Sequence, residues 1–220
     1  HSAYLTKVTK LMFLGSSCIY PKKPRIPIKE EYLLTNELEN TNEMYAIAKI
    51  AGLKICKAYN YQFKTDFRAV MPTNLYGQND NYDDLNSHVL PAFIKKILMA
   101  KKQNAKTFTI WGSGKPRREF LHVDDLADAT VKIMNLSKSK YKKIAGEKFP
   151  FINVGSGSDV SIKDLAKLIS KIVGFKGKMT FDKSKPDGTY RKLMDNTKLK
   201  KIKWKPKISL TSGIKKTIED

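Results

Sequence analysis

The segment NEMYAIAKIAG places Tyr45 and Lys49 four positions apart. On a helix, side chains at this spacing lie on one face, one turn apart. A free tyrosine has a pKa near ~10 and exchanges protons poorly at neutral pH, but a neighbouring ammonium stabilises its phenolate. Such a pair can move a proton at a carbonyl or hydroxyl oxygen. The spacing alone is a weak signal, because a core tyrosine and a surface lysine on an ordinary helix produce it as well.

A second group of candidates, Ser16-Ser17-Cys18, directly follows an apolar run. If that run is a buried strand, the two hydroxyls and the thiol project into the cleft at the end of the strand. Each candidate also has a structural interpretation: Cys18 as a small buried hydrophobic side chain, and His88 as a helix cap or a surface residue. His122 ends a predicted strand and Cys56 lies on the apolar stripe of a predicted helix, so we interpret both as structural.

These side chains need a scaffold, and the hydrophobic pattern predicts alternating strands and helices. Asn42 is the expected N-cap of the helix that carries Tyr45, and Ser161 with Asp164 forms the expected capping box of a later helix. The predicted strands are 11–14, 67–71, 107–111, 120–123, 151–154 and a short one from Met179 onward. The predicted helices cover about 43–63, 89–102, 124–134, 165–173 and the segment after Ser209, and a polar loop covers 74–86.

This alternation predicts an α/β fold, with a parallel sheet and a smaller mixed α/β region in the second half of the chain. Ligands of open parallel sheets bind beyond the carboxyl ends of the strands. The polar segments Gly15–Cys18, Pro72–Tyr76 and His122–Asp125 follow three such ends. We therefore expect them to meet at one edge of the sheet and to form a site there.

The strand-end serine and the helical Tyr-x-x-x-Lys together resemble the extended branch of the short-chain dehydrogenase/reductase superfamily. LYG (75–77) and REFLHVDDLADA (118–129) resemble its members that modify sugar nucleotides. Six ordered blocks over nearly the whole chain narrow the resemblance to the GDP-L-fucose synthase family. They are GSSCIYP (15–21), TNEMYAIAKIAG (41–52), MPTNLYG (71–77), NSHVLPA (86–92), WGSGKPRREFLHVDD (111–125) and SKPDGTYRKLMD (184–195).

The resemblance implies an NADP(H)-dependent enzyme that converts GDP-4-keto-6-deoxy-D-mannose into GDP-L-fucose by 3,5-epimerisation and 4-reduction. Protons at C3 and C5 flank the ketone, so an acid and a base on opposite sides of the sugar can remove and return them. Cys18 and His88 match the family residues for this task, and both residue types titrate in a useful range. Ser16, Tyr45 and Lys49 match the residues that orient and protonate the reacting oxygen.

Other family positions carry over one residue at a time. The positions that match cofactor-binding residues are Leu14, Gly15, Ser16, Ser17, Lys49, Pro72, Thr73, Asn74, Leu75 and His88. The positions that match GDP-sugar-binding residues are Lys96, Trp111, Arg118 and Asp187, and no residue is assigned to a metal. Arg118 suits a diphosphate because its planar guanidinium offers paired donors. Lys96 departs from the family, which often has arginine there, so the charge is kept and the planar fork is lost.

The superfamily's glycine-rich dinucleotide loop is expected after the first strand of the fold, and this sequence does not contain it. Gly155-Ser156-Gly157 lacks the third glycine, because Val160 stands there, and we interpret it as a turn.

The resemblance implies that the glycine-rich part lies upstream of His1 and that the parallel sheet is a partial Rossmann-like one. Residues 1–80 would then be the C-terminal half of the dinucleotide-binding domain, with segments near 118–137 and 151–155 contributing. Residues 81–220 would mainly bind substrate, and the chain alone would bind NADPH poorly.

The net charge of +21 raises the question of a polyanionic partner. The lysines are scattered through every segment, without the clusters of arginine and aromatic residues typical of nucleic-acid-binding modules. We therefore interpret the excess as a solvated surface, and expect neither nucleic acid nor membrane as a partner.

No run of 18 apolar residues could span a bilayer, and two cysteines suit a reducing compartment, which predicts a cytoplasmic protein. We expect a homodimer, because many relatives pair through the helix that bears Tyr-x-x-x-Lys.

Three alternatives stay open, and one of them is that the chain is a degenerate, inactive fragment. Another extended short-chain dehydrogenase/reductase, such as a sugar-nucleotide 4-epimerase or a dehydratase, would share Tyr45 and Lys49 but would not require the pair Cys18 and His88. A basic polyanion-binding module would lose affinity steeply with salt and would be indifferent to GDP-sugars.

Overall fold

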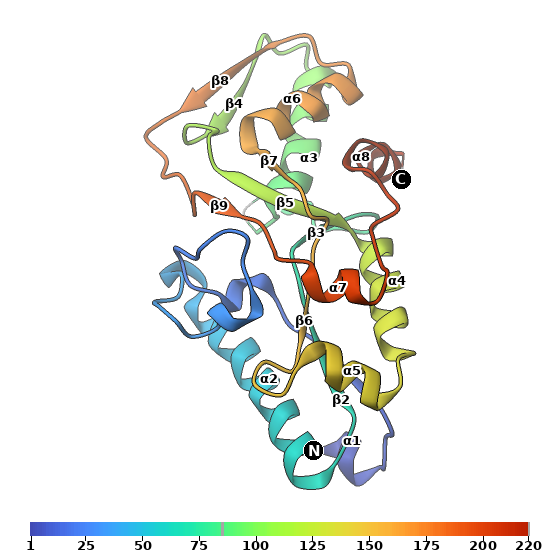
Figure 1. Ribbon diagram of the computed structural model, residues 1–220. Helices are drawn as coiled ribbons and strands as arrows, with labels where there is room; N and C mark the ends of the chain where they lie inside the picture. Colours follow the sequence, from blue (N-terminus) through green and yellow to red (C-terminus); the bar gives the residue numbers. More distant parts are fainter. Residues whose placement is uncertain (85, 220) are drawn as a thin grey trace.

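The computed structural model describes residues 1–84 and 86–219, which form a lower and an upper part in Figure 1. The lower part is built on a parallel three-stranded sheet in the order β1-β2-β6. Its strands are β1 (Leu11–Leu14), β2 (Phe67–Pro72) and β6 (Ile152–Val154). The helices of this part are α1 (Ser2–Leu5), α2 (Glu43–Phe63), α4 (Val123–Met134), α5 (Lys138–Ala145) and α7 (Thr197–Lys201). Three short 3-10 turns lie between β1 and α2, at Ser17–Ile19, Glu30–Tyr32 and Asn40–Asn42.

All six residues of β2 are buried, because the strand has a neighbour on each side and helices on both faces. Ala69 and Met71 pack with Ile50 and Leu53 of α2. Val70 points to the opposite face, where it packs with residues of α4 and α5. This arrangement explains why β2 is apolar apart from Arg68, as expected for a parallel strand that is covered on both faces.

The upper part is built on short sheets against the helix pair α3 (Val89–Lys102) and α6 (Ile162–Val173). One sheet has the order β3-β5-β7, with β9 also paired to β5, and the other pairs β4 with β8 in parallel. The strands are β3 (Asn74–Tyr76), β4 (Thr107–Trp111), β5 (Arg117–His122), β7 (Asp159–Ser161), β8 (Lys178–Asp182) and β9 (Arg191–Lys192). The last helix, α8 (Leu210–Ile218), packs on α6 and β5.

The α/β fold class is confirmed, and the predicted strands and helices are present in the described residues. The capping box is present too: Ser161 Oγ accepts a hydrogen bond from Asp164 N at 3.0 Å and donates one to Asp164 Oδ2 at 2.6 Å. The structure corrects three details. The loop predicted over 74–86 begins with β3, while Leu85 within that loop lies outside the described residues. β5 begins at Arg117 rather than at 120, and Asn42 makes no side-chain cap bond to α2. The elements α1, α5, β7, β9 and α7 were not predicted.

None of the helices in the described ranges has both the length and the apolar character needed to cross a membrane.

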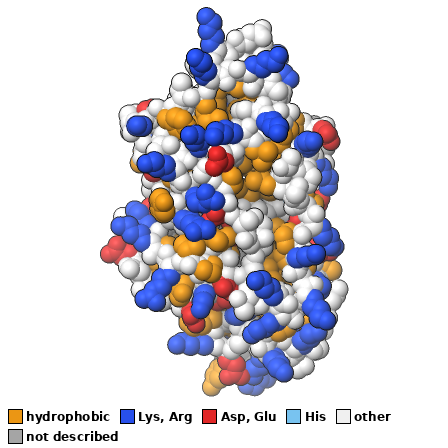
Figure 2. Space-filling model, turned by 45° about the horizontal axis from the view of Figure 1, so that its top comes forward, with side chains coloured by type: hydrophobic (Ala, Val, Ile, Leu, Met, Phe, Trp, Pro, Cys, Tyr) orange, Lys and Arg blue, Asp and Glu red, His pale blue; other side chains and the backbone are white. Residues whose placement is uncertain are grey.

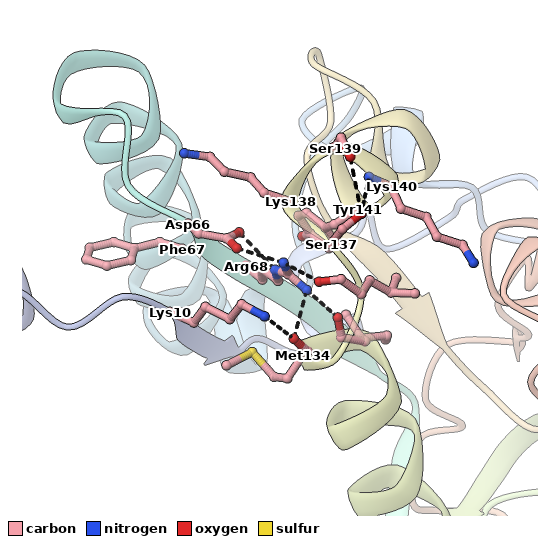
Figure 3. A network of polar contacts seen from close by, with 12 residues as sticks. Lys10, Asp66, Phe67, Arg68, Met134, Ser137, Lys138, Ser139, Lys140 and Tyr141 are labelled. Atoms are coloured by element: carbon pink, nitrogen blue, oxygen red, sulfur yellow. Dashed lines mark hydrogen bonds and ion pairs between the residues drawn. The ribbon is translucent and has the colours of Figure 1, made fainter.

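A buried arginine joins β2 to the end of α4 (Figure 3). The side chain of Arg68 is 0% exposed, and its Nε and Nη2 donate to the two carboxylate oxygens of Asp66 at 2.9 and 2.7 Å. Its other guanidinium hydrogens point to the carbonyl oxygens of Ile133, Met134 and Leu136, at 2.5 to 3.1 Å. The last carbonyls of a helix lack hydrogen-bond partners within the helix and carry the negative end of the helix dipole. A cation placed there donates hydrogen bonds to these carbonyls and interacts favourably with the dipole.

We expect Arg68→Ala to lower the free energy of unfolding by about 3–5 kcal/mol, since it leaves a largely buried carboxylate and several carbonyls without a partner. Urea denaturation of the purified protein measures this loss. Arg25→Ala is the control, because Arg25 is exposed and its removal should change stability by no more than about 0.5 kcal/mol. Equal effects of the two substitutions would show that the network does not stabilise the fold.

Candidate functional site

A cavity of about 590 Å³ opens at the carboxyl ends of β1 and β2, and we call it the strand-end cavity. It collects four of the five predicted catalytic residues: Ser16, Cys18, Tyr45 and His88. All the predicted cofactor-binding positions except Leu14 and Lys49 also line it. The remainder of its wall comes from Asn42, 76–80 and Val123. Of the three polar segments expected at this edge, the first two contribute most of the wall and the third contributes only Val123.

The loop after β1 is held at its start by the sheet. Gly15 N donates to Val70 O at 2.9 Å, which continues the parallel ladder one residue past the strand. A Cβ on Gly15 would lie 2.3 Å from Met71 Sδ, so any larger residue would have to displace the buried Met71 side chain. Ser16 then caps a short 3-10 turn, and its Oγ accepts a hydrogen bond from Cys18 N at 3.1 Å. The hydroxyl hydrogen of Ser16 is left to donate toward the cavity.

Helix α2 presents Tyr45 and Lys49 to the end of β1. Tyr45 is 48% exposed and lines the cavity. Lys49 Nζ donates to Leu14 O at 2.9 Å and lies 5.5 Å from the centre of the Tyr45 ring. The bond to Leu14 holds the ammonium beside the tyrosine, although neither Lys49 nor Leu14 is part of the cavity wall. The Lys49 ammonium can therefore act on the Tyr45 phenol from outside the cavity wall.

The segment after β2 is anchored by a buried glutamate, Glu119. Thr73 Oγ1 and Asn74 Nδ2 both donate to the backbone oxygen of Glu119, at 3.2 and 2.8 Å. The Glu119 carboxylate, 0% exposed, accepts from Gly157 N at 2.6 Å and from Met194 N at 2.9 Å. Burial raises the pKa of Glu119, and these backbone donors oppose that rise. One residue thus ties the cavity wall to two other segments.

A second cavity of about 350 Å³ contains all four predicted GDP-sugar positions, and we call it the tryptophan cavity. Trp111 is 63% exposed at the end of β4, which leaves a planar indole face open. Lys96 Nζ lies 4.8 Å from the centre of the indole ring. Lys185 Nζ lies 5.7 Å from the same ring. Two ammonium groups beside an exposed aromatic ring suit a ligand that combines a flat group with negative charge.

Arg118 brings an unneutralised charge to the tryptophan cavity. Its Nη1 donates to the backbone oxygens of Arg117 and Thr189, and no acidic side chain in residues 1–84 and 86–219 pairs with it. Burial lowers the pKa of Arg118. An anionic ligand would supply a counter-ion.

Asp187, the fourth predicted substrate position, is engaged with its neighbours in this structure. Its carboxylate accepts from Ser113 N at 2.8 Å and from Ser113 Oγ at 2.6 Å. These bonds lower the pKa of Asp187 and keep it ionised. Gly112 has φ +77° and would bring a Cβ to 2.3 Å from Asp187 Oδ1, so the turn requires glycine on both grounds.

The two cavities adjoin at the start of α3, where Ser87 lines one and His88 lines the other. His88 occupies the N-cap position of α3, but its side chain makes no cap hydrogen bond. The structural interpretation of His88 as a side-chain cap is therefore not supported. His88 lines the strand-end cavity from the start of α3, and Cys18 lines it from the loop after β1.

Sequence reasoning missed one residue beside the tryptophan cavity and one residue of the wall of the strand-end cavity. Lys185 belongs to a loop, and only the pairing of β4 with β8 brings that loop beside Trp111. Asn42 was assigned to a helix cap, whereas it lines the strand-end cavity and its Oδ1 has no hydrogen-bond partner in the described part of the chain. Its position directly before the helix that bears Tyr45 was the available signal. The described residues contain no cluster of His, Cys, Asp or Glu side chains that could hold a metal ion.

Comparison with known proteins places this geometry in a family. The model of the NAD dependent epimerase/dehydratase family matches residues 1–149. The chain belongs to this family. It is 52% identical over 219 residues to GDP-L-fucose synthase 1 of Arabidopsis thaliana, covering 100% of this chain and 65% of the relative. It is 51% identical over 219 residues to GDP-L-fucose synthase of Escherichia coli (strain K12), covering 100% of this chain and 68% of the relative. The resemblance stated from the sequence blocks is confirmed.

Solved structures agree with the family assignment. A GDP-6-OMe-4-keto-L-xylo-heptose reductase from C. jejuni superposes with a TM-score of 0.92 at 38% identity, covering 100% of this chain and 72% of that chain. A GDP-L-fucose synthetase from Naegleria fowleri bound to NADP superposes with a TM-score of 0.87 at 31% identity, covering 99% and 67%. The chain spans 61% to 68% of the length of the curated relatives that it matches at 48% identity or more.

His122, which we interpreted as structural, lies outside both cavities. It is 1% exposed, packs edge-on against Tyr76, and caps α4 by accepting a hydrogen bond from Asp124 N at 3.2 Å through Nδ1. Burial lowers its pKa, while the nearby Asp124 and Asp125 oppose this and Lys216 reinforces it. The folded protein therefore holds this imidazole neutral more firmly than the unfolded chain does.

We expect stability to fall as the pH drops below the ordinary histidine value of about 6.5, because the unfolded chain then binds a proton that folded His122 resists. Each unit by which the folded pKa lies below the unfolded one is worth about 1.4 kcal/mol. His122→Asn keeps a cap acceptor without titrating, so its stability should change less between pH 7 and pH 5. Urea denaturation at several pH values tests this, with exposed His1→Asn as control. Parallel profiles for wild type and His122→Asn would contradict the expectation.

Proposed function

We propose that this chain carries the catalytic and substrate-binding residues of a GDP-L-fucose synthase. The proposed reaction is the NADP(H)-dependent 3,5-epimerisation and 4-reduction of GDP-4-keto-6-deoxy-D-mannose. The observation that supports it most is the meeting of Cys18, His88 and Tyr45 on one cavity that adjoins a second cavity with an exposed tryptophan and an unpaired arginine. The first cavity has groups for proton transfer on a sugar, and the second has groups for a nucleoside diphosphate.

The strand-end cavity fits a nicotinamide cofactor. Its wall at 15–17 and 72–75 consists of strand ends with small or flat side chains, and its volume of about 590 Å³ falls in the range of ligand sites. NADPH, when bound, supplies the hydride for C4 of the sugar. We assign residues 1–80, together with the segments near 118–137 and 151–155, to the cofactor-binding domain, and residues 81–220 mainly to substrate binding. A relative from Naegleria fowleri binds NADP, which supports this choice of cofactor.

Side chains of this chain can donate and accept the protons of the proposed reaction. Tyr45 protonates the C4 oxygen, and the ammonium of Lys49, held by Leu14 O at 2.9 Å, favours the phenolate that results. The free hydroxyl hydrogen of Ser16 orients the same oxygen. Cys18 and His88 exchange protons at C3 and C5 from different sides, because one comes from the loop after β1 and the other from the start of α3.

The tryptophan cavity would hold the GDP part of the substrate. The indole of Trp111 offers a stacking face for the guanine base, and Lys96 and Lys185 lie beside it. Arg118 supplies paired donors and an unneutralised charge for the diphosphate. Asp187 would accept hydrogen bonds from the ligand through the lone pairs that its two contacts with Ser113 leave free.

The rival functions have less support. A 4-epimerase or a dehydratase would use Tyr45 and Lys49 but has no need for a thiol and an imidazole on the same cavity. A polyanion-binding module would need its cations gathered on one surface, whereas Figure 2 shows Lys and Arg side chains scattered over the whole visible face. We therefore propose that nucleic acid and membranes are not partners.

We also propose a homodimer in the cytoplasm. Helix α2 exposes large apolar side chains, with Met44 at 73%, Ile47 at 47% and Ile55 at 54% exposure. Exposed alanines at 48, 51 and 58 continue the same face, so a second helix could approach closely. A stripe of this kind on a helix is a surface that a second copy would cover. Both cysteines are free thiols, in keeping with a reducing compartment.

The proposed function predicts that the protein, expressed from its complete gene, consumes NADPH when given GDP-4-keto-6-deoxy-D-mannose. The readout is the loss of absorbance at 340 nm, with GDP-L-fucose identified by chromatography. Cys18→Ser and His88→Ala should each slow proton exchange at C3 and C5 by about 10²-fold or more while the protein still binds NADPH. If a folded protein that binds NADPH leaves the substrate unchanged, the proposed function is wrong.

The tryptophan cavity predicts GDP binding with a fluorescence signal, since the chain has two tryptophans and only Trp111 is exposed. GDP should quench the emission, and Trp111→Ala should abolish the quenching and weaken binding by about 1–3 kcal/mol through lost stacking. Trp204→Phe is the control, because Trp204 is buried and donates to Asp128 at 2.7 Å. Quenching that survives Trp111→Ala would place the base elsewhere.

A further inference from the structure

The loop that carries Cys18 is tied to β6 by a buried tyrosine. Tyr20 follows Cys18 by two residues and is 3% exposed. Its hydroxyl donates to Asn153 Oδ1 in the middle of β6 at 2.5 Å. Tyr20 does not line the strand-end cavity, so its phenol does not touch a ligand there. Any effect of Tyr20 on the site must therefore act through the position of the loop that carries Cys18.

Asn153 is itself held by two further hydrogen bonds. Its Nδ2 donates to Ile28 O at 2.9 Å, and its backbone N donates to Glu30 Oε1 at 3.0 Å. Lys198 Nζ lies 3.8 Å from the same Glu30 oxygen and donates to three backbone carbonyls of the segment before β6. Asn153 is 0% exposed and Glu30 is 6% exposed. The acceptor that Tyr20 meets is therefore fixed from several sides.

The geometry of the loop transmits this constraint to the thiol. The loop starts at Gly15, which is bonded to Val70 O of β2, and it ends at Tyr20, which is bonded to β6. Between them lies a single 3-10 turn, Ser17–Ile19, and Ile19 is 0% exposed in the core. Cys18 is the residue of this turn that lines the cavity without being buried. Two strands of one sheet thus hold the two ends of a short turn that presents the thiol.

We propose that Tyr20 is a positioning residue: through its hydrogen bond to Asn153 it sets where the thiol of Cys18 stands in the strand-end cavity. The consequence for catalysis rests on the proposed function, whereas the placement of the thiol does not. Proton transfer depends steeply on geometry, and small displacements of a reacting group can slow a reaction by orders of magnitude. Tyr20→Phe keeps the ring in the core and removes only the bond.

The experiment compares Tyr20→Phe with Tyr141→Phe in the protein expressed from its complete gene. Tyr141 is a matched control: it is 5% exposed, its hydroxyl donates to Pro150 O at 2.9 Å, and it packs on the opposite face of β2. The first readout is the rate at which iodoacetamide alkylates Cys18, followed by mass spectrometry against pH. Cys56, which is buried, is the internal reference. The second is deuterium exchange at C3 and C5 of the GDP-sugar, with kcat and KM separated and NADPH binding measured alongside.

We expect Tyr20→Phe to change the alkylation rate of Cys18 at least threefold and to lower kcat for exchange about tenfold, with KM and NADPH binding within twofold of wild type. Tyr141→Phe should lower Tm to a similar extent and change neither rate. Asn153→Ala removes the acceptor from the other side, and the double variant should be no worse than the poorer single variant.

If Tyr20→Phe lowers Tm but leaves both rates unchanged, Tyr20 has only a structural role and the proposal is overturned. Equal changes of both rates in Tyr141→Phe would overturn it as well, because the effect would then be general loosening. If the wild type folds but does not exchange protons on the GDP-sugar, the proposed function fails. The alkylation comparison still decides the role of Tyr20 in that case.

Discussion

The site depends on the parallel ladder of β1, β2 and β6. Gly15 N bonds to Val70 O at 2.9 Å, and Thr73 N bonds to Val154 O at 3.0 Å, so the ladder continues past both strand ends. Because the carboxyl ends of parallel strands share one edge of a sheet, residues far apart in the sequence arrive at one cavity. β2 has no exposed residue, and a slip of one position would turn its side chains to the opposite faces. Packing of the β2 side chains therefore fixes the pairing register of the strand, and this register places the strand-end residues at the cavity.

Long elements could be predicted from the sequence, because their periodicity is strong. α2 and α3 begin and end where the pattern placed them, at Glu43–Phe63 and Val89–Lys102. β3, β7 and β9 could not be predicted, since these two- or three-residue segments lack the apolar run that marked the equally short β6. These strands exist because β5 offers them a partner, which is a tertiary effect. The strand-end residues of the site were predictable for the opposite reason: the parallel topology alone brings them together.

The parts of the site that escaped prediction depend on loops. Lys185 reaches Trp111 because the pairing of β4 with β8 brings its loop beside the tryptophan. Asn42 has the residue type of a helix cap, but a 3-10 turn precedes α2 and leaves its side chain facing the cavity. Local propensity placed Asn42 directly before a helix, which is where it lies, and gave no role to Lys185. It could not describe their surroundings, which come from segments more than seventy residues away in the case of Ser113 and Asp187.

The proposed chemistry requires that the lower and upper parts of the molecule keep a fixed relative position, since Cys18 comes from the lower part and His88 from the upper part. The connection from β5 into α4 carries the buried polar groups that hold them together. Glu119 binds backbone groups of two other segments, and Asp125 accepts from the backbone N–H groups of Lys207 and Ile208 at 2.9 and 3.0 Å. Buried carboxylates add little net stability, yet their bonds are directional and costly to leave unmade. The exposed lysines, which dominate the charge, cannot have this effect because solvent screens them. The few buried acids, rather than the many surface cations, therefore determine whether a thiol and an imidazole can face the same sugar.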